Sequence, residues 1–457
     1  MQRKPPIDKI LESAQRIHMI GIGGSGMCPL AEILHGQGYS LTGSDVLEGD
    51  SLNRLKALDI GVFMGHATAN VHGSELVVYS AAISAENPEI AEANRLDIPC
   101  VERSVLLGAI TRRFSDTVGV SGTHGKTTVT SMITQIMYMS GFDPTAVIGG
   151  RLPVIGSNGR AGQSEICVVE SCEFVNTFLE LSPDHVVITN IDNDHLDYFK
   201  TMDNLVLSFK KFAALAAKSV TANGDDPLAM QAAAAARVPV ETFGMSDKNN
   251  YYPENITFLP GIRAEFDLMH GGRKLDRISL NVPGEHNMLN ALAAAAVCLR
   301  LGASVGQVKT GLYDFRGAGR RFEVHGTVHD LLIVDDYAHH PTEVMSTLKA
   351  CKTIAKGQVW AVFQPFTFSR TAMLMDEFAD ALGIADHVVL TPIMGSREVN
   401  TTGVCSEQLA ELIPGAVVVP DFDAVRDYIF AHAAPNDLMI TMGGGDIYKA
   451  ARLMMKG

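Results

Sequence analysis

A glycine-rich loop that contains a lysine is the clearest chemical feature of the chain, and it reads Gly122-Thr123-His124-Gly125-Lys126-Thr127-Thr128. The loop resembles a Walker A motif, although Val120 stands where the first glycine of that motif falls. In such loops the lysine contacts the β- and γ-phosphates of a nucleoside triphosphate, and the next hydroxyl coordinates Mg²⁺. We therefore expect all seven residues to bind ATP, with Lys126 supporting phosphoryl transfer.

A carboxylate and an imidazole follow two further expected strands, at the sheet edge where ligands gather in parallel α/β folds. Glu170 and His195 each come after a short β-branched stretch. Mg²⁺ takes few protein ligands and keeps phosphate and water oxygens, so this pair beside a triphosphate loop suits that ion. Asp192 and Asp194 either bind metal or cap a helix, and the sequence leaves both interpretations open.

A second glycine-rich loop reads Gly21-Ile22-Gly23-Gly24-Ser25-Gly26 and matches the GxGxxG fingerprint. It follows an expected strand, opens an expected helix and precedes Asp45, which ends the next strand. The glycines let a pyrophosphate approach the backbone, and the N–H groups of the helix N-terminus bind it. Because this loop has no lysine, it predicts a diphosphate ligand, either a nicotinamide dinucleotide or a UDP-sugar.

Three later groups of polar residues are not decisive by themselves. His286, Asn287 and Asn290 either bind adenine or cap an alanine-rich helix. Arg320 and Arg321 lie at a turn-rich junction, where domain closure could bring a cation to the γ-phosphate, unless they are surface charges. The last group follows the first strand of the third expected domain and comprises Asp336, Tyr337 and His339.

Strands and helices alternate in three successive segments, which predicts parallel sheets built from βαβ units. The predicted fold class is α/β, with three consecutive α/β domains at residues 1–110, 111–318 and 319–457. The expected strands are 16–20, 39–42, 76–79, 117–120, 166–170, 186–190, 331–334, 359–363, 388–390, 417–419 and 438–441. The expected helices include 27–34, 51–58, 126–140 and 290–301.

The composition is typical of a soluble globular protein, because 46% of the 457 residues are hydrophobic and 19% are charged. A net charge of −14 argues against a nucleic-acid partner, which requires clustered basic residues. The seven cysteines are scattered and form no CxxC pair, which indicates reduced thiols. No apolar run reaches the roughly 18 residues of a membrane helix, and no hydrophobic signal region opens the chain. We expect a cytoplasmic protein that does not insert into membranes.

Together these motifs resemble the Mur ligase family over essentially the whole chain. They occur in the family's order and spacing, as GTHGKTT, the Glu170 strand end, TNIDNDHLD, GEHNMLNALAA, GRRFE and DDYAHHPTEV. GIGGSGM with GSD, and the form DDYAHHP, are similar to the branch of the family that adds L-alanine. The resemblance implies a Rossmann-like UDP-binding domain, a P-loop ATP-binding central domain and a Rossmann-like C-terminal domain that closes over ATP and the amino acid.

The resemblance also implies a reaction. The enzyme would use ATP and Mg²⁺ to join L-alanine to the lactyl carboxylate of UDP-N-acetylmuramate through an acyl phosphate, and would release ADP and phosphate. This reaction belongs to peptidoglycan precursor synthesis. We expect UDP-N-acetylmuramate and L-alanine as the partners of a monomer or homodimer.

The family motifs assign a role to each matching residue. The implied catalytic residues are Lys126, Glu170, His195, Arg321 and His339, and the implied Mg²⁺ ligands are Thr127, Glu170 and His195. ATP would also contact His286, Asn287, Asn290, Arg320, Arg321 and Asp336. The UDP-sugar would contact Gly21, Gly23, Gly24, Ser25, Gly26, Asp45, His66, Ser80 and Arg103. The amino acid would contact Tyr337, His339 and Arg370.

Two motifs depart from the family pattern. An acidic stretch usually similar to EADESD reads ESCEFV here, so that Cys172 and Val175 replace two carboxylates. A motif usually similar to QPHRYTRT reads QPFTFSRT, which places Phe366 and Thr367 at a histidine and an arginine position but keeps Arg370. Both changes fall near the expected sugar and amino-acid sites. Because Thr367 replaces the arginine, we expect either weaker binding of the amino-acid carboxylate or a compensating cation elsewhere, such as Arg397.

Other functions share parts of this pattern. A recycling ligase that joins a whole tripeptide to UDP-N-acetylmuramate has the same chemistry and needs only a roomier amino-acid site. Folylpolyglutamate synthase shares the chemistry but lacks the N-terminal GxGxxG. A nicotinamide-dependent dehydrogenase would explain the first loop and Asp45 but not the Gly-Lys-Thr core. A non-enzymatic nucleotide switch would explain only the ATP loop.

Overall fold

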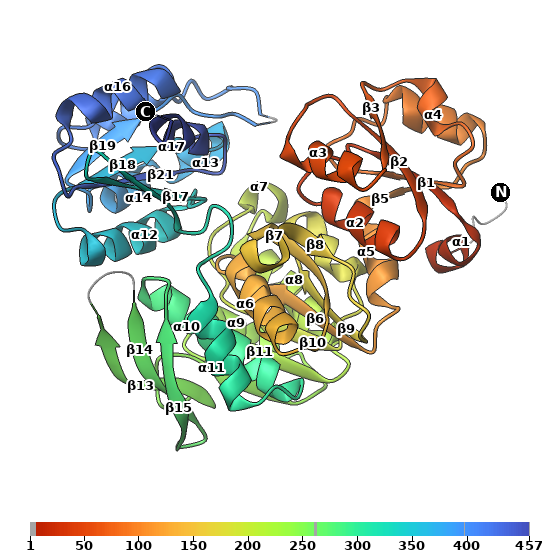
Figure 1. Cartoon of the computed structure of the whole chain (residues 1–457), viewed down its shortest axis with the longest axis horizontal. Coiled ribbons are helices and arrows are strands. Elements are labelled where there is room, and N and C mark those ends of the chain that lie inside the picture. Colours follow the sequence, from red (N-terminus) through yellow and green to blue (C-terminus); the bar gives the residue numbers. More distant parts are fainter. Residues whose placement is uncertain (1–5, 260–262, 397, 457) are drawn as a thin grey trace. The chain divides into compact units, whose positions relative to one another are not determined.

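The computed structural model describes residues 6–259, 263–396 and 398–456, so Arg397 lies outside the described residues. The described chain has three β-sheets with helices packed on them, which confirms the predicted α/β fold class (Figure 1). By proximity of its residues the chain forms two compact units, of which the first comprises 1–253, 269–275 and 290–311. The second unit comprises 254–268, 276–289 and 312–457. The domain boundaries at 110 and 318 remain predictions.

The first sheet, in the described part of the chain, has five parallel strands in the order β3-β2-β1-β4-β5 (Figure 1). The strands are β1 (Arg16–Ile20), β2 (Ser40–Asp45), β3 (Gly61–Met64), β4 (Leu76–Tyr79) and β5 (Cys100–Glu102). The helices are α1 (Ile7–Ser13), α2 (Cys28–Gly36), α3 (Asp50–Ala57), α4 (Pro88–Arg95) and α5 (Arg103–Thr111), with a 3₁₀ turn at Thr68–Val71. Apolar residues of β1 and β4 pack on both faces of this sheet. The two faces of the central strands are therefore both buried, as parallel sheets require.

The second sheet has ten strands in the described chain, in the order β15-β14-β13-β12-β11-β10-β6-β9-β7-β8. Its strands are β6 (Asp116–Ser121), β7 (Thr145–Leu152), β8 (Ser157–Arg160), β9 (Ile166–Glu170), β10 (His185–Ile188), β11 (Ser219–Asn223), β12 (Val240–Phe243), β13 (Tyr251–Phe258), β14 (Ala264–His270) and β15 (Arg273–Leu280). Its helices are α6 (Lys126–Met139), α7 (Leu196–Phe199), α8 (Met202–Leu215), α9 (Pro227–Ala233), α10 (Glu285–Arg300) and α11 (Val305–Asp314), with 3₁₀ segments at Pro153–Ile155 and Phe174–Glu180. Strand β6 is paired in parallel with β9 and β10, so the segments that follow these three strands meet at one edge.

The third sheet has six strands in the described chain, in the order β16-β17-β21-β18-β19-β20. These are β16 (Glu323–Val328), β17 (Leu331–Asp336), β18 (Val359–Phe363), β19 (His387–Leu390), β20 (Val417–Val418) and β21 (Leu438–Met442). The helices are α12 (Pro341–Ile354), α13 (Phe368–Met373), α14 (Met375–Leu382), α15 (Ser406–Glu411), α16 (Phe422–His432) and α17 (Tyr448–Met454). Alternate residues of β18 pack with α12, α14 and α15 on one face and with α16 and α17 on the other. This alternation produces the continuous apolar run Val359–Phe363.

The expected strands are all present, although several observed ones were not predicted. β3 is only four residues long, and its apolar side chains are mostly exposed. The β7–β8 hairpin contains glycines at 149, 150, 156 and 159, which weaken the strand signal. β16 is an antiparallel edge strand whose side chains are only partly buried.

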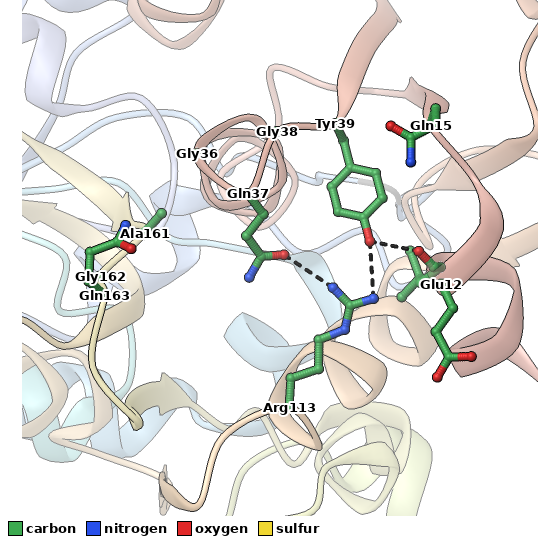
Figure 2. Close-up of a pocket in the computed structure, with 11 residues that line it drawn as sticks. Glu12, Gln15, Gly36, Gln37, Gly38, Tyr39, Arg113, Ala161, Gly162 and Gln163 are labelled. Carbon is green, nitrogen blue, oxygen red and sulfur yellow. Dashed lines mark hydrogen bonds between the residues drawn. The ribbon is translucent and has the colours of Figure 1, made fainter.

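A polar cavity of about 510 Å³ lies in the first unit (Figure 2). No residue of either glycine-rich loop lines it. Arg113 donates hydrogen bonds there to Gln37 Oε1 at 3.4 Å and to the Tyr39 hydroxyl at 3.1 Å. Gln15 and Tyr39 stand just before β1 and β2, whereas the glycine loop follows the carboxyl end of β1. The cavity is therefore at the opposite edge of the first sheet from the candidate site.

Candidate active site

The ATP loop joins β6 to α6 and is closely surrounded by other backbone and side chains. Gly122 and Gly125 have positive φ values of 141° and 84°, which other residues adopt only with strain. A Cβ atom on Gly122 would lie 1.9 Å from Thr189 Oγ1, and one on Gly125 would lie 2.5 Å from Asn290 Oδ1. Glycine is therefore required at both positions by conformation and by space. Asn290, expected near adenine, lies directly against the loop.

The segment that follows β10 holds the ATP loop in place. His124 N–H donates to Asn190 Oδ1 at 2.8 Å, and Asn190 Nδ2 donates back to the His124 carbonyl at 3.0 Å. The Asp192 N–H donates to Thr123 Oγ1 at 2.8 Å, and His124 Nε2 lies 3.0 Å from Asp192 Oδ2. Asp192 thus interacts with the loop residues themselves. Its role as a metal ligand or cap remains open.

Lys126 begins α6 and turns its ammonium back over the loop. Its Nζ donates to the Gly122 carbonyl, to the Thr123 carbonyl at 3.0 Å and to Glu173 Oε1 at 3.0 Å. Burial by itself would lower the pKa of Lys126, but the carboxylates of Glu173 and Glu170 outweigh it and raise the pKa above its ordinary value. The lysine is therefore a permanent cation in the loop.

Glu173 is a site residue that the sequence analysis did not select. Its side chain is 1% exposed, and it forms the ion pair with Lys126. A sequence signal existed, because Glu173 is a carboxylate that remains in the stretch where Cys172 and Val175 replace two others. A buried carboxylate needs a cationic partner, and here the partner is the lysine of the phosphate loop.

Thr127 and Glu170 meet at the expected metal position. Thr127 Oγ1 donates to Glu170 Oε1 at 3.1 Å, and the Gly149 N–H donates to Glu170 Oε2 at 2.7 Å. A Cβ on Gly149 would lie 2.5 Å from Glu170 Oε2, so the strand passes close to the carboxylate. A hydroxyl and a carboxylate oxygen this close together are the hard oxygen donors that Mg²⁺ prefers, so these residues fit that ion.

His195 lies beside Glu173 and Asp194. His195 Nε2 is 4.0 Å from Glu173 Oε1 and 3.6 Å from Asp194 Oδ2. Its backbone has a positive φ of 57°, and its ring stacks at a tilt on Phe174 with centroids 4.8 Å apart. The ring is thus held near the lysine–glutamate pair, and its metal contact remains a prediction.

Cys172 and Val175, which stand at the two carboxylate positions of the family, lie in different environments. Burial raises the pKa of the Cys172 thiol to about 11, and the charge of Glu173 adds to this effect. Val175 is 47% exposed and has a positive φ of 55°, which is unusual for a β-branched residue. Cys172 therefore stays a neutral thiol beside the ATP loop at ordinary pH.

The first glycine-rich loop follows β1 and opens α2. Gly23 N–H donates to Asp45 Oδ2 at 2.9 Å, and the other Asp45 oxygen accepts from the Val46 N–H at 2.8 Å. Gly24 N–H donates to the Gly21 carbonyl at 3.1 Å, which closes a tight turn. A Cβ on Gly26 would lie 3.2 Å from Arg103 Cδ. The structure therefore gathers the loop, the acid and the arginine at one edge of the first sheet.

His66 and Ser80 lie at the same edge of this sheet. His66 Nδ1 is 3.0 Å from Glu89 Oε2 and 3.1 Å from Ser44 Oγ. Glu89 is fully buried. Burial alone would raise its pKa, but hydrogen bonds from His18, Ser44 and Asn70 lower the pKa of Glu89 to about 2. Glu89 is thus a buried anion that fixes the His66 ring, and the sequence analysis missed it.

Replacement of Gly23 by valine is expected to weaken binding of the sugar nucleotide. A Cβ there would lie 2.8 Å from Leu52 Cδ2 and 3.0 Å from Asp45 Oδ2, so the side chain would displace the turn that approaches the diphosphate. We expect the Kd for UDP-N-acetylmuramate to rise at least about tenfold, while the KM for ATP stays within about twofold. Isothermal titration and steady-state kinetics measure the two effects.

Gly49→Ala is the matched control for this loop. Gly49 precedes α3 with an extended φ of 176°, and nothing lies within 4 Å of an added Cβ. Normal affinity for UDP-N-acetylmuramate in a folded Gly23→Val protein would contradict the assignment of the loop.

His286 and Asn287 begin α10 in the second unit. The ring of His286 lies against Gly284, where an added Cβ would be 2.5 Å from its Cε1, and burial lowers the pKa of His286 to about 4. Asn287 Nδ2 donates to the Pro283 carbonyl at 2.7 Å. The Asn287 amide therefore stabilises the turn that leads into the helix. Adenine binding by these residues remains a prediction.

Arg320 and Arg321 contact different residues. Arg320 donates to Asp335 Oδ2 at 3.0 Å and to the carbonyls of Gly443 and Gly445 at 2.7 Å each. Its guanidinium is thus engaged within the C-terminal sheet. Arg321 Nη1 is 3.9 Å from Glu343 Oε1. The phosphate contacts expected of both arginines remain predictions.

Asp336, Tyr337 and His339 follow the carboxyl end of β17, as predicted. Asp336 accepts hydrogen bonds from the N–H groups of Phe322 and Ala338 at 2.7 Å each, and burial raises its pKa to about 6. His339 Nδ1 is 3.2 Å from Glu343 Oε2, and the rings of Tyr337 and His339 meet edge to face with centroids 5.1 Å apart.

The third-domain motif with the two replacements lies beside His339. Phe366, at the family's histidine position, has its ring centroid 6.1 Å from that of His339. Thr367, at the family's arginine position, has a φ of 66° and precedes α13, which carries Arg370. The motif therefore reaches the expected amino-acid site with an aromatic ring instead of an imidazole.

The α/β fold thus has two glycine-rich loops that follow strands of two different sheets, and only one of the loops contains a lysine. Three family descriptions match the chain: "Mur ligase family, catalytic domain" at residues 16–115, "Mur ligase middle domain" at 120–298 and "Mur ligase, glutamate ligase domain" at 320–445. The chain therefore belongs to the Mur ligase family.

Individual relatives are similar over nearly the whole length. The UDP-N-acetylmuramate–L-alanine ligase of Acetivibrio thermocellus is 41% identical over 449 residues, covering 97% of this chain and 96% of the relative. The ligase of the same name from Caldanaerobacter subterraneus is 39% identical over 452 residues, covering 98% of each chain. The crystal structure of a UDP-N-acetylmuramate–alanine ligase from Thermotoga maritima is 27% identical, with a TM-score of 0.83 and coverage of 96% of this chain and 98% of that one.

A more distant structure shows the same fold. The murein peptide ligase of Psychrobacter arcticus is 24% identical, with a TM-score of 0.71 and coverage of 97% of this chain and 98% of that one. No helix in the described part of the chain has the length and apolar character needed to span a membrane.

Proposed function

We propose that this protein is an ATP-dependent ligase that joins L-alanine to the lactyl carboxylate of UDP-N-acetylmuramate in peptidoglycan precursor synthesis. The observation that carries the proposal is the Lys126 loop beside the Thr127–Glu170 pair. This arrangement occurs in a chain that is 41% identical over 449 residues to an enzyme named for that reaction. A dehydrogenase would account for neither observation, and a nucleotide switch would account only for the loop.

The chemistry proceeds in two transfers. The lactyl carboxylate attacks the γ-phosphorus of ATP, the bond to the β-phosphate oxygen breaks, and an acyl phosphate and ADP form. The uncharged amino group of L-alanine then attacks the acyl carbon, phosphate leaves, and the amine loses a proton. Lys126 stabilises the charge that develops on the transferred phosphoryl group, because its ammonium is fixed in the loop.

Mg²⁺, when bound, supplies charge neutralisation at the phosphate oxygens. Thr127, Glu170 and His195 are the proposed ligands. The remaining assignments are also proposals: Arg321 contacts the phosphates, and His339 serves the amino-acid side. His286, Asn287, Asn290, Arg320 and Asp336 are proposed for the nucleotide. The first loop with Asp45, His66, Ser80 and Arg103 is proposed for the UDP-sugar.

The proposed domain roles follow the predicted boundaries. Residues 1–110 would bind the UDP-sugar, 111–318 would bind ATP, and 319–457 would close over ATP and the amino acid. We further propose that the enzyme acts in the cytoplasm as a monomer or homodimer, without nucleic-acid partners.

Arg370→Ala is expected to raise the KM for L-alanine at least about tenfold and to leave the KM for ATP within about twofold. Arg370 is proposed to bind the carboxylate of the amino acid through a charge-assisted hydrogen bond, and it is not among the residues proposed to contact ATP. Initial rates with each substrate varied in turn measure the effect. Equal changes in both KM values would contradict the assignment.

The proposed function is tested by phosphate release from ATP with UDP-N-acetylmuramate, screened across amines, with the product mass determined. We expect L-alanine to be the best substrate and glycine and L-serine to be poor ones, because one methylene contributes only about 1–3 kcal/mol to selectivity. Faster turnover of a γ-D-glutamyl tripeptide would identify a recycling ligase. NADH formation with a hydroxy substrate would instead support a dehydrogenase.

A further inference from the structure

The β7–β8 hairpin, whose strands are labelled in Figure 1, contacts both the first glycine-rich loop and the proposed metal carboxylate. On β7, the Gly149 N–H donates to Glu170 Oε2 at 2.7 Å. On β8, Asn158 Nδ2 donates to the Ser25 carbonyl at 2.8 Å. One short antiparallel element, wholly within the first compact unit, therefore connects the two phosphate sites.

The Asn158 amide can be oriented in only one way. Its side chain is buried, and its Oδ1 accepts a hydrogen bond from Arg54 Nη2 at 3.1 Å. A guanidinium has no acceptor and a carbonyl has no donor, so the amide oxygen must face Arg54 and the amide nitrogen must face Ser25. Arg54 is itself held by Glu32 Oε1 at 3.2 Å.

The backbone of β8 is packed tightly on α2, the helix that the glycine loop opens. A Cβ on Gly159 would lie 2.5 Å from Pro29 Cα, and a Cβ on Gly36 would lie 2.6 Å from Ala161 Cβ. Ser157 Oγ also donates to Glu32 on α2. Because such close packing leaves little room for sliding, the hairpin fixes the start of α2 relative to β7.

We propose that Asn158 is a positioning residue, which holds the first glycine loop in register with Glu170. This inference rests on the proposed function, since the lactyl carboxylate of a UDP-sugar bound at the loop must reach a phosphorus bound near Glu170. A displacement of about 1 Å far from the reacting atoms can lower a rate by about 100-fold. Asn158 acts through Ser25 and through the hairpin, and it is not assigned to substrate contact.

Three variants separate positioning from general stability. Asn158→Ala removes both amide contacts. Asn158→Asp has the same shape and still accepts from Arg54, but an ionised carboxylate cannot donate to the Ser25 carbonyl. Ser157→Ala is the matched control, because it removes a neighbouring contact between β8 and α2 that does not touch the glycine loop.

The full-length variants are compared by kcat and KM for each substrate, by titration with UDP-N-acetylmuramate alone, and by Tm. Both Asn158 variants are expected to lose about 10- to 100-fold in kcat/KM for UDP-N-acetylmuramate, with the KM for ATP within about twofold. Asn158→Asp is expected to keep the wild-type Tm, and Ser157→Ala to keep wild-type kinetics.

Two results would overturn the inference. The first is an Asn158→Asp protein with wild-type kinetics, because this would show that only the Arg54 contact matters. The second is a Ser157→Ala protein as defective as Asn158→Ala, because this would reduce the effect to general docking of β8 on α2. Turnover by the wild-type protein is measured first. If the wild type shows no turnover, the proposed function and this inference are both overturned. If the wild type turns over and the Asn158 variants are unimpaired, only this inference is overturned.

Discussion

A Lys126→Ala variant is expected to lose at least about 10²–10³-fold in kcat, the largest effect of any single substitution considered. The ammonium contacts the carbonyls of the ATP loop, and the lysine side chain is only 15% exposed. Its charge is therefore already in position when negative charge develops on the γ-phosphoryl group. Phosphate release under saturating ATP and UDP-N-acetylmuramate measures the loss.

The same substitution is also expected to destabilise the fold. Glu173 is 1% exposed and pairs with Lys126, so the variant leaves a buried carboxylate without its partner, at a cost of about 3–5 kcal/mol. The double variant Lys126→Ala with Glu173→Gln removes the stranded charge, so it should recover stability but not activity. Thermal unfolding separates the two effects.

Lys218→Ala is the matched control for Lys126. Lys218 pairs with Asp116 at 2.7 Å at the other edge of the same sheet, and its side chain is 44% exposed. A pair this exposed contributes at most about 1 kcal/mol, so activity should remain normal. Turnover near the wild-type rate by folded Lys126→Ala protein would remove the loop lysine from the mechanism.

Glu170→Gln is expected to raise the Mg²⁺ concentration that gives half-maximal rate by about 10- to 100-fold. The glutamine keeps the shape of the side chain but loses the charge and one acceptor oxygen. In the wild type, the two Glu170 oxygens accept hydrogen bonds from Thr127 and Gly149. The glutamine side chain of the variant has only one acceptor oxygen, so it must lose one of these contacts. Rates at saturating ATP, measured against free Mg²⁺, give the shift.

Glu165→Gln is the matched control, because Glu165 is an exposed residue that directly precedes the same strand, at its other end. Its Mg²⁺ dependence should equal that of the wild type. The effects of Thr127→Val and Glu170→Gln on the Mg²⁺ dependence should not be additive, because the two side chains form one site. Unchanged Mg²⁺ dependence in Glu170→Gln would show that the carboxylate has a structural role only.

The sequence by itself determined the local chemistry and the fold class. The Gly-Lys-Thr core, the GxGxxG loop and the apolar strands of β1, β9 and β18 follow from short-range patterns of backbone freedom and burial. The strand end at Glu170 was predictable for the same reason, since a buried β-branched run that stops at a carboxylate identifies both the strand and its edge.

Only the tertiary structure decided which distant residues meet. Glu173 pairs with Lys126 across 47 positions, and Asn158 reaches Ser25 across 133 positions, and no periodicity encodes either contact. The β7–β8 hairpin escaped prediction because its glycines, which weaken a strand in sequence, permit close approach to Glu170 and Pro29. Arg320 and Arg321 are adjacent and chemically equal in the sequence. The C-terminal sheet makes them different, because Arg320 donates to Asp335 and to the carbonyls of Gly443 and Gly445, whereas Arg321 lies 3.9 Å from Glu343.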